Sequence, residues 1–403
     1  MRILHLGISD LLGGASKASY LIHKTLLKDN IESRMLVLKK LSDDDLVFQS
    51  KNRFSNIILA KLERYWLRKK IIGNISFSSN YFSEMIIDNE LIKWADLVNI
   101  HWIGNSTLSY SKINYINKPL VWRLSDQFPF TGGCHFSGNC NNYEQYCGNC
   151  YLLKNSNEDD LSKIIFINKN KYIQKFKSLT IVSPSEWMDN KIKKSTLFKE
   201  RNKVVIHTGI DTNIFKNNSL IKSNKNKINL LFIADDPIKN ERKGYNYLEQ
   251  LVNQKLSLEE RKKCKLIIIG EEDPSYPLDL NIINERLGKI ENLESLKEYY
   301  SKADILIAPY LEDNLPNTIL EAMACETVVL SFKIGGIPEI IDHKINGYLS
   351  LPNNIDDFYN GFRYLINNNF KDLKIKARSK VVEKFNKDIN YKKYIDLYQS
   401  LLK

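Results

Sequence analysis

Asp313 and Glu321 are two carboxylates eight residues apart, on either side of Pro316. Proline suits the first turn of a helix, so we predict a helix here, with Asp313 in the loop before it and Glu321 inside it. The first backbone amides of such a helix lack partners and attract phosphate. Each carboxylate can accept hydrogen bonds from paired hydroxyl groups, such as those of a ribose or a hexose. The segment therefore predicts a site for a phosphorylated sugar compound.

Two cations and a glycine turn would complete this site. Arg242 and Lys243 come after the first predicted strand of the second half, and Gly335-Gly336 follows a later strand. Lysine offers a phosphate a point charge, and arginine offers it a fork of donors. Without these neighbours, an ordinary loop with a polar helix start would explain the segment around Pro316 equally well.

A further glycine pair, Gly13-Gly14, lies between the first predicted strand and a helical pattern. Glycines at such a junction let backbone N–H groups approach a ligand at the positive end of the helix. The segment does not have the G-x-G-x-x-G spacing, which disfavours a dinucleotide site.

Four cysteines, Cys134, Cys140, Cys147 and Cys150, fall within one short segment. Two thiolates separated by two residues, as in the last pair, can bind one tetrahedral ion. We predict a structural zinc site and favour it over two disulfides, because the N-terminus does not resemble an export signal. The alternative is four reduced thiols that bind nothing.

Short apolar runs alternate with helical patterns along the chain, which is typical of βαβ units and parallel sheets. A polar stretch at 216–227 interrupts the alternation. We therefore predict two Rossmann-like, doubly wound α/β domains that face a central cleft. Their expected bounds are 1–215 with a cysteine-rich insertion near 134–150, then 216–387, then a helix at 388–403 that packs back on the first domain. The predicted strands are 2–7, 34–38, 97–102, 119–124, 179–184, 204–207, 228–234, 265–270, 304–309 and 327–332.

The composition excludes a largely disordered chain, because 43% of the 403 residues are hydrophobic. The apolar runs are far shorter than the ~20 residues of a membrane span, so we expect a soluble, cytoplasmic protein. The net charge of +12 favours an acidic partner, namely a phosphorylated small molecule, an anionic membrane or a nucleic acid. A merely solvated basic surface is the alternative.

Residues 54–70 combine an apolar stripe with a strongly basic remainder. A helix of this kind can lie on an anionic membrane. Periodicity alone favours the other interpretation, in which the stripe faces the core. The apolar residues are Phe54, Ile57, Ile58, Leu62, Tyr65 and Trp66, and the basic ones are Lys61, Arg64, Arg68, Lys69 and Lys70.

Several segments in a fixed order resemble one known family over nearly the whole chain. They are 13–15, 95–102, 122–126, 129–135, 182–185, 208–211 and 310–347. Together they resemble the retaining, nucleotide-sugar-dependent glycosyltransferases of family 4, which have the GT-B fold. The segment 131–135 with its cysteines looks like the subgroup that builds bacterial surface polysaccharides of the colanic acid, O-antigen or capsule type.

The resemblance implies roles for individual residues. Asp313 would hold the hydroxyls of the donor sugar, Glu321 would hold the ribose, and Lys243 would balance the diphosphate. The other donor-binding residues that it implies are Gly13, Gly14, Arg242, Asn314, Leu315 and Gly336. In the family the first acid is a glutamate, so Asp313 reaches one methylene less far. The usual Gly-Arg is replaced by residues 234–236, and Arg242 is the candidate substitute for that arginine.

Ser125 stands where many family members have a histidine. This leaves His101, Asp126 and His135 as candidates for the group that the histidine supplies. A transfer in which the leaving diphosphate accepts the acceptor's proton needs little from a base, because protein cations stabilise the leaving group. We therefore expect activity without the histidine and without a metal or cofactor in catalysis.

The resemblance implies a hexosyl-transferring enzyme that moves a sugar from a UDP- or GDP-linked donor to a saccharide acceptor, expected to be lipid-linked, at the inner face of the cell membrane. A catalytically silent sugar-nucleotide-binding subunit is the alternative. It is motivated by Ser125 and by Cys325-Glu326, where glycine usually follows the cysteine. A nucleic-acid partner is disfavoured, because a recognition helix with clustered cations is not evident.

Overall fold

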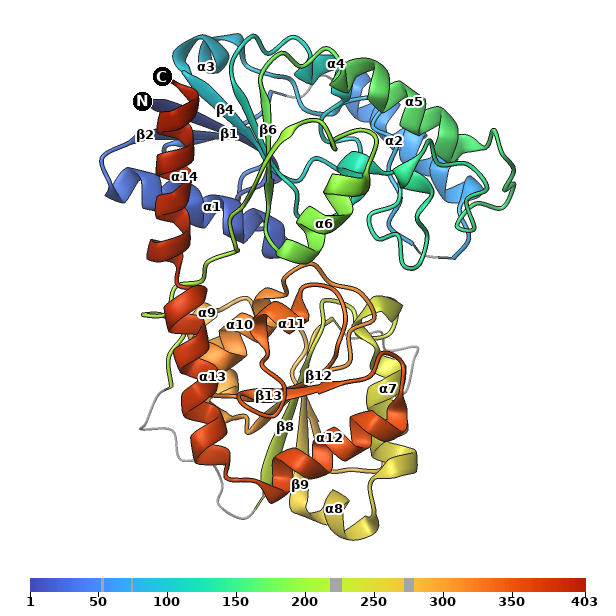
Figure 1. Ribbon diagram of the computed structural model, residues 1–403, viewed down its shortest axis with the longest axis vertical. Coiled ribbons are helices and arrows are strands. Elements are labelled where there is room, and N and C mark those ends of the chain that lie inside the picture. The colour runs from blue at the N-terminus through green and yellow to red at the C-terminus, as the bar shows by residue number, and fades with distance from the viewer. Residues whose placement is uncertain (52–53, 74, 218–226, 272–278) are drawn as a thin grey trace. The chain divides into compact units, whose positions relative to one another are not determined.

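The computed structural model describes residues 1–51, 54–73, 75–217, 227–271 and 279–403. The chain divides into two compact units, Met1–His207 with Asn390–Lys403, and Thr208–Ile389 (Figure 1). Each unit contains one parallel sheet with helices packed against it, as predicted for two Rossmann-like domains. Every strand predicted from the sequence lies in one of the two sheets.

The first unit is built on a seven-stranded sheet of order β3-β2-β1-β4-β5-β6-β7. Its strands are β1 (Arg2–Ser9), β2 (Glu32–Lys39), β3 (Val47–Gln49), β4 (Leu97–Ile100), β5 (Leu120–Arg123), β6 (Leu179–Ser183) and β7 (Asn202–Val205). Its helices are α1 (Gly13–Lys28), α2 (Phe54–Lys70), α3 (Asn89–Trp94), α4 (Tyr110–Ile113), α5 (Leu161–Ile173) and α6 (Glu186–Lys194), with 3-10 turns at Phe128–Phe130 and Asn142–Glu144.

The strands of this sheet are apolar because both of their faces are covered. Leu4 and Leu6 of β1 pack in one hydrophobic cluster, and Ile3 packs in another. Since successive side chains of a strand point to opposite faces, the two clusters lie on opposite sides of the sheet. The final helix, α14 (Lys387–Leu401), contributes Tyr391, Tyr394 and Tyr398 to the second cluster, where Ile22 and Leu26 of α1 also lie. The prediction that this helix returns to the first unit is confirmed.

The second unit is built on a six-stranded sheet of order β10-β9-β8-β11-β12-β13. Its strands are β8 (Ile228–Ile233), β9 (Cys264–Ile269), β10 (Asn284–Arg286), β11 (Ile305–Ala308), β12 (Val328–Phe332) and β13 (Gly347–Ser350). Its helices are α7 (Tyr245–Gln250), α8 (Leu258–Lys263), α9 (Leu293–Lys302), α10 (Asn317–Ala324), α11 (Ile337–Ile340), α12 (Ile355–Asn367) and α13 (Phe370–Lys384), with a 3-10 turn at Glu241–Lys243 and a π-helical turn at Leu251–Lys255.

The first junction between the units falls after His207, whereas the sequence pattern placed it after residue 215. The backbone explains the difference. The amide of Ile210 donates to the carbonyl of Phe385, and the amide of Lys387 donates to the carbonyl of Ile210. Ile210 and Phe215 are also buried in a core cluster of the second unit. These residues therefore belong to the second unit, although no regular element begins there.

The orientation of α2 differs from the core-facing arrangement that its sequence favoured. The buried residues of α2 are Ala60, Glu63 and Leu67, whereas Phe54, Leu62 and other residues of the apolar stripe are exposed. Among the residues described, every helix is too short or too polar to cross a membrane.

Candidate functional site

Asp313 binds the side chains of both predicted cations. Nη1 of Arg242 lies 2.8 Å and Nζ of Lys243 lies 3.0 Å from Oδ2 of Asp313. These residues come from the loops that follow β8 and β11, which are neighbours in the sheet, so their carboxyl ends meet at one edge. Burial opposes the charged form of Asp313, but the charges of Lys243 and Arg242 outweigh it and lower the pKa of that carboxyl. The carboxyl group of Asp313 is therefore held in its charged form.

Glycines allow the backbones of these loops to approach each other closely. A Cβ atom on Gly244, which has φ +72°, would lie 1.9 Å from the carbonyl oxygen of Pro309. A Cβ atom on Gly335, with φ +57°, would lie 1.9 Å from the carbonyl oxygen of Asp313. The amide of Gly336 donates to the same carbonyl at 3.2 Å. The predicted glycine turn thus supports the backbone of the acidic residue.

The predicted helix after the loop is α10, which begins at Asn317. Pro316 occupies the N-cap position in an extended conformation, one residue earlier than the first turn expected for it. The hydroxyl of Thr318 in the first turn lies 2.8 Å from that of Tyr310. Nζ of Lys243 lies 4.0 Å from the ring centroid of the same tyrosine, so Tyr310 links the cation to the start of the helix.

The second predicted acid, Glu321, is positioned by a different partner. Its Oε2 accepts a hydrogen bond of 2.8 Å from the hydroxyl of Tyr300. Burial raises the pKa of Tyr300 well above its ordinary value, and the charge of Glu321 raises it further. The tyrosine thus remains a donor that orients this carboxylate. The two adjoining donor-site candidates, Asn314 and Leu315, are both buried.

The first glycine pair lies where it was predicted, at the start of α1. Gly13 has φ +74°, and a Cβ atom there would have no neighbour within 4 Å among the described atoms. A residue that sequence reasoning passed over, Asp10, holds this loop in place. Its buried carboxylate accepts hydrogen bonds of 2.9 and 2.8 Å from the amides of Leu41 and Ser42. The loop before Gly13 is therefore tied to the loop after β2.

Of the three candidates for the missing histidine's place, His101 lies in the interior. Its Nε2 is 2.9 Å from Nδ1 of His5, and burial lowers its pKa well below the ordinary value. Asp126 and His135 contact each other, with Nδ1 of His135 2.6 Å from Oδ2 of Asp126. Nε2 of His135 is 2.8 Å from the hydroxyl of Ser78, which completes a buried Ser-His-Asp arrangement. The sequence did not reveal Ser78 as a partner of His135, because Ser78 lies 57 residues before it.

The four clustered cysteines are all unpaired and line one cavity of about 20 Å³, which is room for one water-sized guest. The amide of Gly132 donates to Sγ of Cys147 at 3.1 Å. Burial raises the pKa of the Cys134 thiol to about 12. Within the part of the chain that is described, no three His, Cys, Asp or Glu side chains are placed so that they could hold a metal ion.

A buried lysine lies beside this cavity. Nζ of Lys169 donates to the carbonyl oxygens of Phe128 and Thr131 and lies 3.6 Å from the ring centroid of Phe128. Burial lowers the pKa of Lys169 to about 7, although the neighbouring Cys134 and Cys147 act in the opposite direction. Burial therefore disfavours the charged form of Lys169 more than the two neighbouring cysteines favour it.

Comparison with known proteins shows which families and structures parts of this chain are similar to. Residues 227–368 match the family described as Glycosyl transferases group 1. An uncharacterized glycosyltransferase of Methanocaldococcus jannaschii is 31% identical over 161 residues, which are 38% of this chain and 41% of that protein. An uncharacterized glycosyltransferase of Haemophilus influenzae is 23% identical over 333 residues, which are 81% of this chain and 82% of that protein.

The fold is also that of solved structures. The crystal structure of Anabaena HepE in complex with UDP-glucose aligns with a TM-score of 0.66 and 16% identity, over 99% of this chain and 100% of that one. The expected GT-B arrangement of two Rossmann-like sheets is confirmed. The chain therefore has the GT-B fold, and its residues 227–368 are similar to the Glycosyl transferases group 1 family.

Proposed function

We propose that this protein transfers a hexose with retention from a nucleotide-diphosphate sugar to a saccharide acceptor. The observation that carries the proposal is the pairing of Arg242 and Lys243 with Asp313 beside the start of α10. Two cations in a largely dehydrated loop suit the two phosphates of such a donor. HepE binds UDP-glucose, which supports a UDP-linked donor here, with a GDP-linked one as the alternative.

In the proposed complex Lys243 and Arg242 turn toward the diphosphate while Asp313 remains beside them. The anomeric C–O bond to the diphosphate breaks, and the acceptor hydroxyl forms its new bond on the same face of the sugar. The leaving phosphate oxygen accepts the proton of that hydroxyl. The two cations stabilise the charge that develops on the leaving group, which lowers the barrier without a protein base. Asp313 holds sugar hydroxyls, and Glu321, oriented by Tyr300, holds the ribose.

We propose that Asn314, Leu315 and Gly336 complete the donor site of the second unit. The family resemblance also supports donor contacts for Gly13 and Gly14 at the start of α1. Asp126 orients His135 through the contact at 2.6 Å, and we assign this pair to the support of the loop that carries it. His101 has no proposed catalytic part, because its contact with His5 and its burial fit a neutral interior histidine.

The acceptor is proposed to be a lipid-linked saccharide of surface polysaccharide assembly, met at the inner face of the cell membrane. The resemblance of the cysteine-containing segment to enzymes of that kind supports it. The rival proposal is a silent nucleotide-sugar-binding subunit. One of the two observations behind it, the residue Glu326 in place of a glycine, has another explanation. Glu326 has φ +64° directly after the C-cap residue of α10, so the usual glycine there serves backbone conformation and not chemistry.

We also propose that Cys134, Cys140, Cys147 and Cys150 draw together around a structural zinc ion. The shared cavity and the N–H···S bond to Cys147 support this, because a tetrathiolate site carries negative charge that a backbone donor stabilises. Elemental analysis of the purified protein should find one zinc per chain, and Cys147→Ser should lose it. Cys264→Ser, at a buried thiol of the second unit, is the matched control. A zinc-free wild-type protein after growth and purification with zinc would contradict the site.

Donor binding and transfer test the main proposal separately. Thermal shifts with UDP, GDP, UDP-hexoses and GDP-mannose should reveal one stabilising series, and Lys243→Ala should reduce the shift. Lys262→Ala, at an exposed lysine of α8, serves as the control. Binding without donor hydrolysis or transfer to any saccharide would favour the silent subunit. Equal shifts in wild type and Lys243→Ala would remove the proposed donor site.

A further inference from the structure

The helix α2 exposes large apolar side chains along its outward side. Phe54 is 78% exposed, Tyr65 60%, Leu62 57% and Trp66 42%. A helix stripe of this kind is normally buried in a core, because each such side chain costs free energy in water. An exposed contiguous apolar face therefore indicates a surface that meets another apolar phase.

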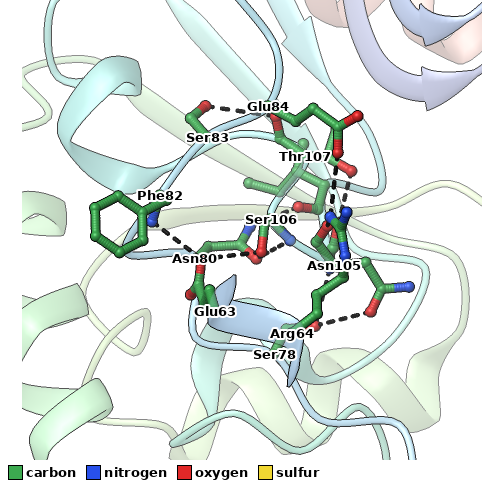
Figure 2. Close-up of polar contacts among 12 residues, drawn as sticks. Glu63, Arg64, Ser78, Asn80, Phe82, Ser83, Glu84, Asn105, Ser106 and Thr107 are labelled. Carbon is green, nitrogen blue, oxygen red and sulfur yellow. Dashed lines mark hydrogen bonds and ion pairs between the residues drawn. The ribbon is translucent and has the colours of Figure 1, made fainter. Parts of the chain in front are cut away.

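A buried carboxylate on the opposite side fixes this orientation. Glu63 accepts hydrogen bonds from the amides of Tyr81 and Phe82 at 2.9 and 3.1 Å, and from the hydroxyls of Ser79 and Ser106. Figure 2 shows Glu63 at this cluster and the ring of Phe82 pointing away from it. A charged group with four donors would lose all of them if the helix rolled. The apolar side is thus held outward by the fold.

A second side-chain contact holds α2 in the same orientation. Nη1 of Arg64 lies 3.1 Å from Oε2 of Glu84 and 3.0 Å from the carbonyl oxygen of Asn105 (Figure 2). Arg64 therefore belongs to the anchored side, although its sequence position suggested a cation on the free surface.

The outward side also carries positive charge. Lys61, Arg68 and Lys69 are exposed, and Nζ of Lys69 lies 4.4 Å from the ring centroid of Tyr65. Glu63 is the single acidic residue of the α2 sequence, and it is buried on the other side. The exposed surface of α2 is therefore both apolar and cationic. This combination matches a bilayer that contains anionic lipid, where apolar side chains enter the interface and lysines meet phosphate head groups.

We propose that α2 docks on an anionic lipid bilayer, with its axis in the membrane plane and Phe54, Leu62, Tyr65 and Trp66 inserted at the interface. The inference deepens the proposed function by naming the surface that brings the enzyme to a lipid-linked acceptor. Its test measures lipid binding alone, so its failure would leave the donor site intact, and failure of the donor site would leave it intact.

The experiment is co-sedimentation of the full chain with phosphatidylcholine vesicles, with and without phosphatidylglycerol. We expect the wild type to sediment with the anionic vesicles. Lys61→Glu combined with Lys69→Glu should weaken binding about tenfold or more, since each basic residue near an anionic surface contributes. Leu62→Ser combined with Tyr65→Ser should weaken it too. Lys262→Glu combined with Lys263→Glu makes the same charge change on exposed residues of α8 and should bind as the wild type does.

Two further readouts keep the result interpretable. Trp66 fluorescence should shift to the blue with anionic vesicles, and Trp66→Phe should abolish that shift while sedimentation persists. Each variant should retain the wild-type melting temperature, which shows that the fold is intact. Unchanged sedimentation of both α2 variants, or equal loss in the α8 control, would overturn the proposal. So would a wild-type dimer in solution that the α2 substitutions dissociate, because the face would then bind a second copy.

Discussion

Nζ of Lys243 lies 3.0 Å from Oδ2 of Asp313, and this contact joins the loops that follow two neighbouring strands of the second sheet. Arg242 reaches the same oxygen at 2.8 Å. Because one carboxylate carries a single negative charge against two cations, the cluster retains excess positive charge. This excess is what a diphosphate would bind.

Replacing Lys243 by alanine should therefore slow transfer strongly. We expect kcat to fall about 100-fold, the usual effect of removing one preorganised charge that stabilises a leaving group. Lys243→Arg should retain part of the activity, because it keeps the charge but not the compact geometry. Steady-state kinetics with the identified donor measures both. An unaltered kcat in Lys243→Ala would assign leaving-group stabilisation elsewhere.

Asp313→Asn should reduce stability in a pH-dependent way. The lowered pKa of Asp313 means that its contribution is fully present above the unfolded pKa of about 4 and is lost as the pH falls through the lower folded value. At pH 7 the variant should lose about 3 kcal/mol, because two cations lose their counter-charge. The difference from wild type should shrink in urea titrations toward pH 3. A difference that stays constant with pH would show that the carboxylate charge is not the cause.

Gly335→Ala should disturb both the fold and the donor site. The new Cβ would lie 1.9 Å from the Asp313 carbonyl at φ +57°. We expect a loss of about 3 kcal/mol from left-handed strain and overpacking together. Gly288→Ala is the control, because Gly288 has φ +60° without a neighbour within 4 Å of the added atom. It should lose only about 1 kcal/mol and keep wild-type nucleotide binding, and equal losses would refute the close approach as the cause.

Glu326→Gly should stabilise the protein by about 1 kcal/mol, because Glu326 has φ +64° at the end of α10. The Glu326→Gly substitution also removes a hydrogen bond of 2.8 Å that the carboxylate accepts from Asn217. Because this bond lies at the surface, its loss should cost little stability. Glu326→Ala removes that bond but keeps the strained backbone, so it should give no gain. The melting temperatures of the wild type, Glu326→Gly and Glu326→Ala test this prediction. A gain in Glu326→Ala equal to the gain in Glu326→Gly would contradict the backbone explanation.

Sequence patterns revealed the inner strands but not three short outer ones. β3, β10 and β13 lie at the sheet edges and have only three or four residues each. Asn284–Arg286 of β10 is wholly polar, so it has no hydrophobic run to find. Pairing with a neighbouring strand, which depends on the assembled sheet, defines these elements.

The candidate site was visible as separate motifs, but its contacts were not. The distance of 70 residues between Lys243 and Asp313 is closed only by the adjacency of β8 and β11. Hydrophobic periodicity did not predict which side of α2 faces outward, for a related reason. Glu63 is the single acidic residue of that helix, and its four donors come from Ser79, Tyr81, Phe82 and Ser106 outside the helix. The hydrophobic pattern therefore predicted the wrong orientation for α2.

The return of α14 to the first unit has a consequence for synthesis on the ribosome. Tyr391, Tyr394 and Tyr398 are almost fully buried in that unit, yet they are translated after all of Thr208–Ile389. The first unit therefore has an uncovered apolar face while the second unit is being synthesised. The second unit is continuous in sequence and can fold as it emerges. Nascent chains that lack the last fourteen residues, 390–403, should accordingly depend on chaperones that bind exposed apolar surface.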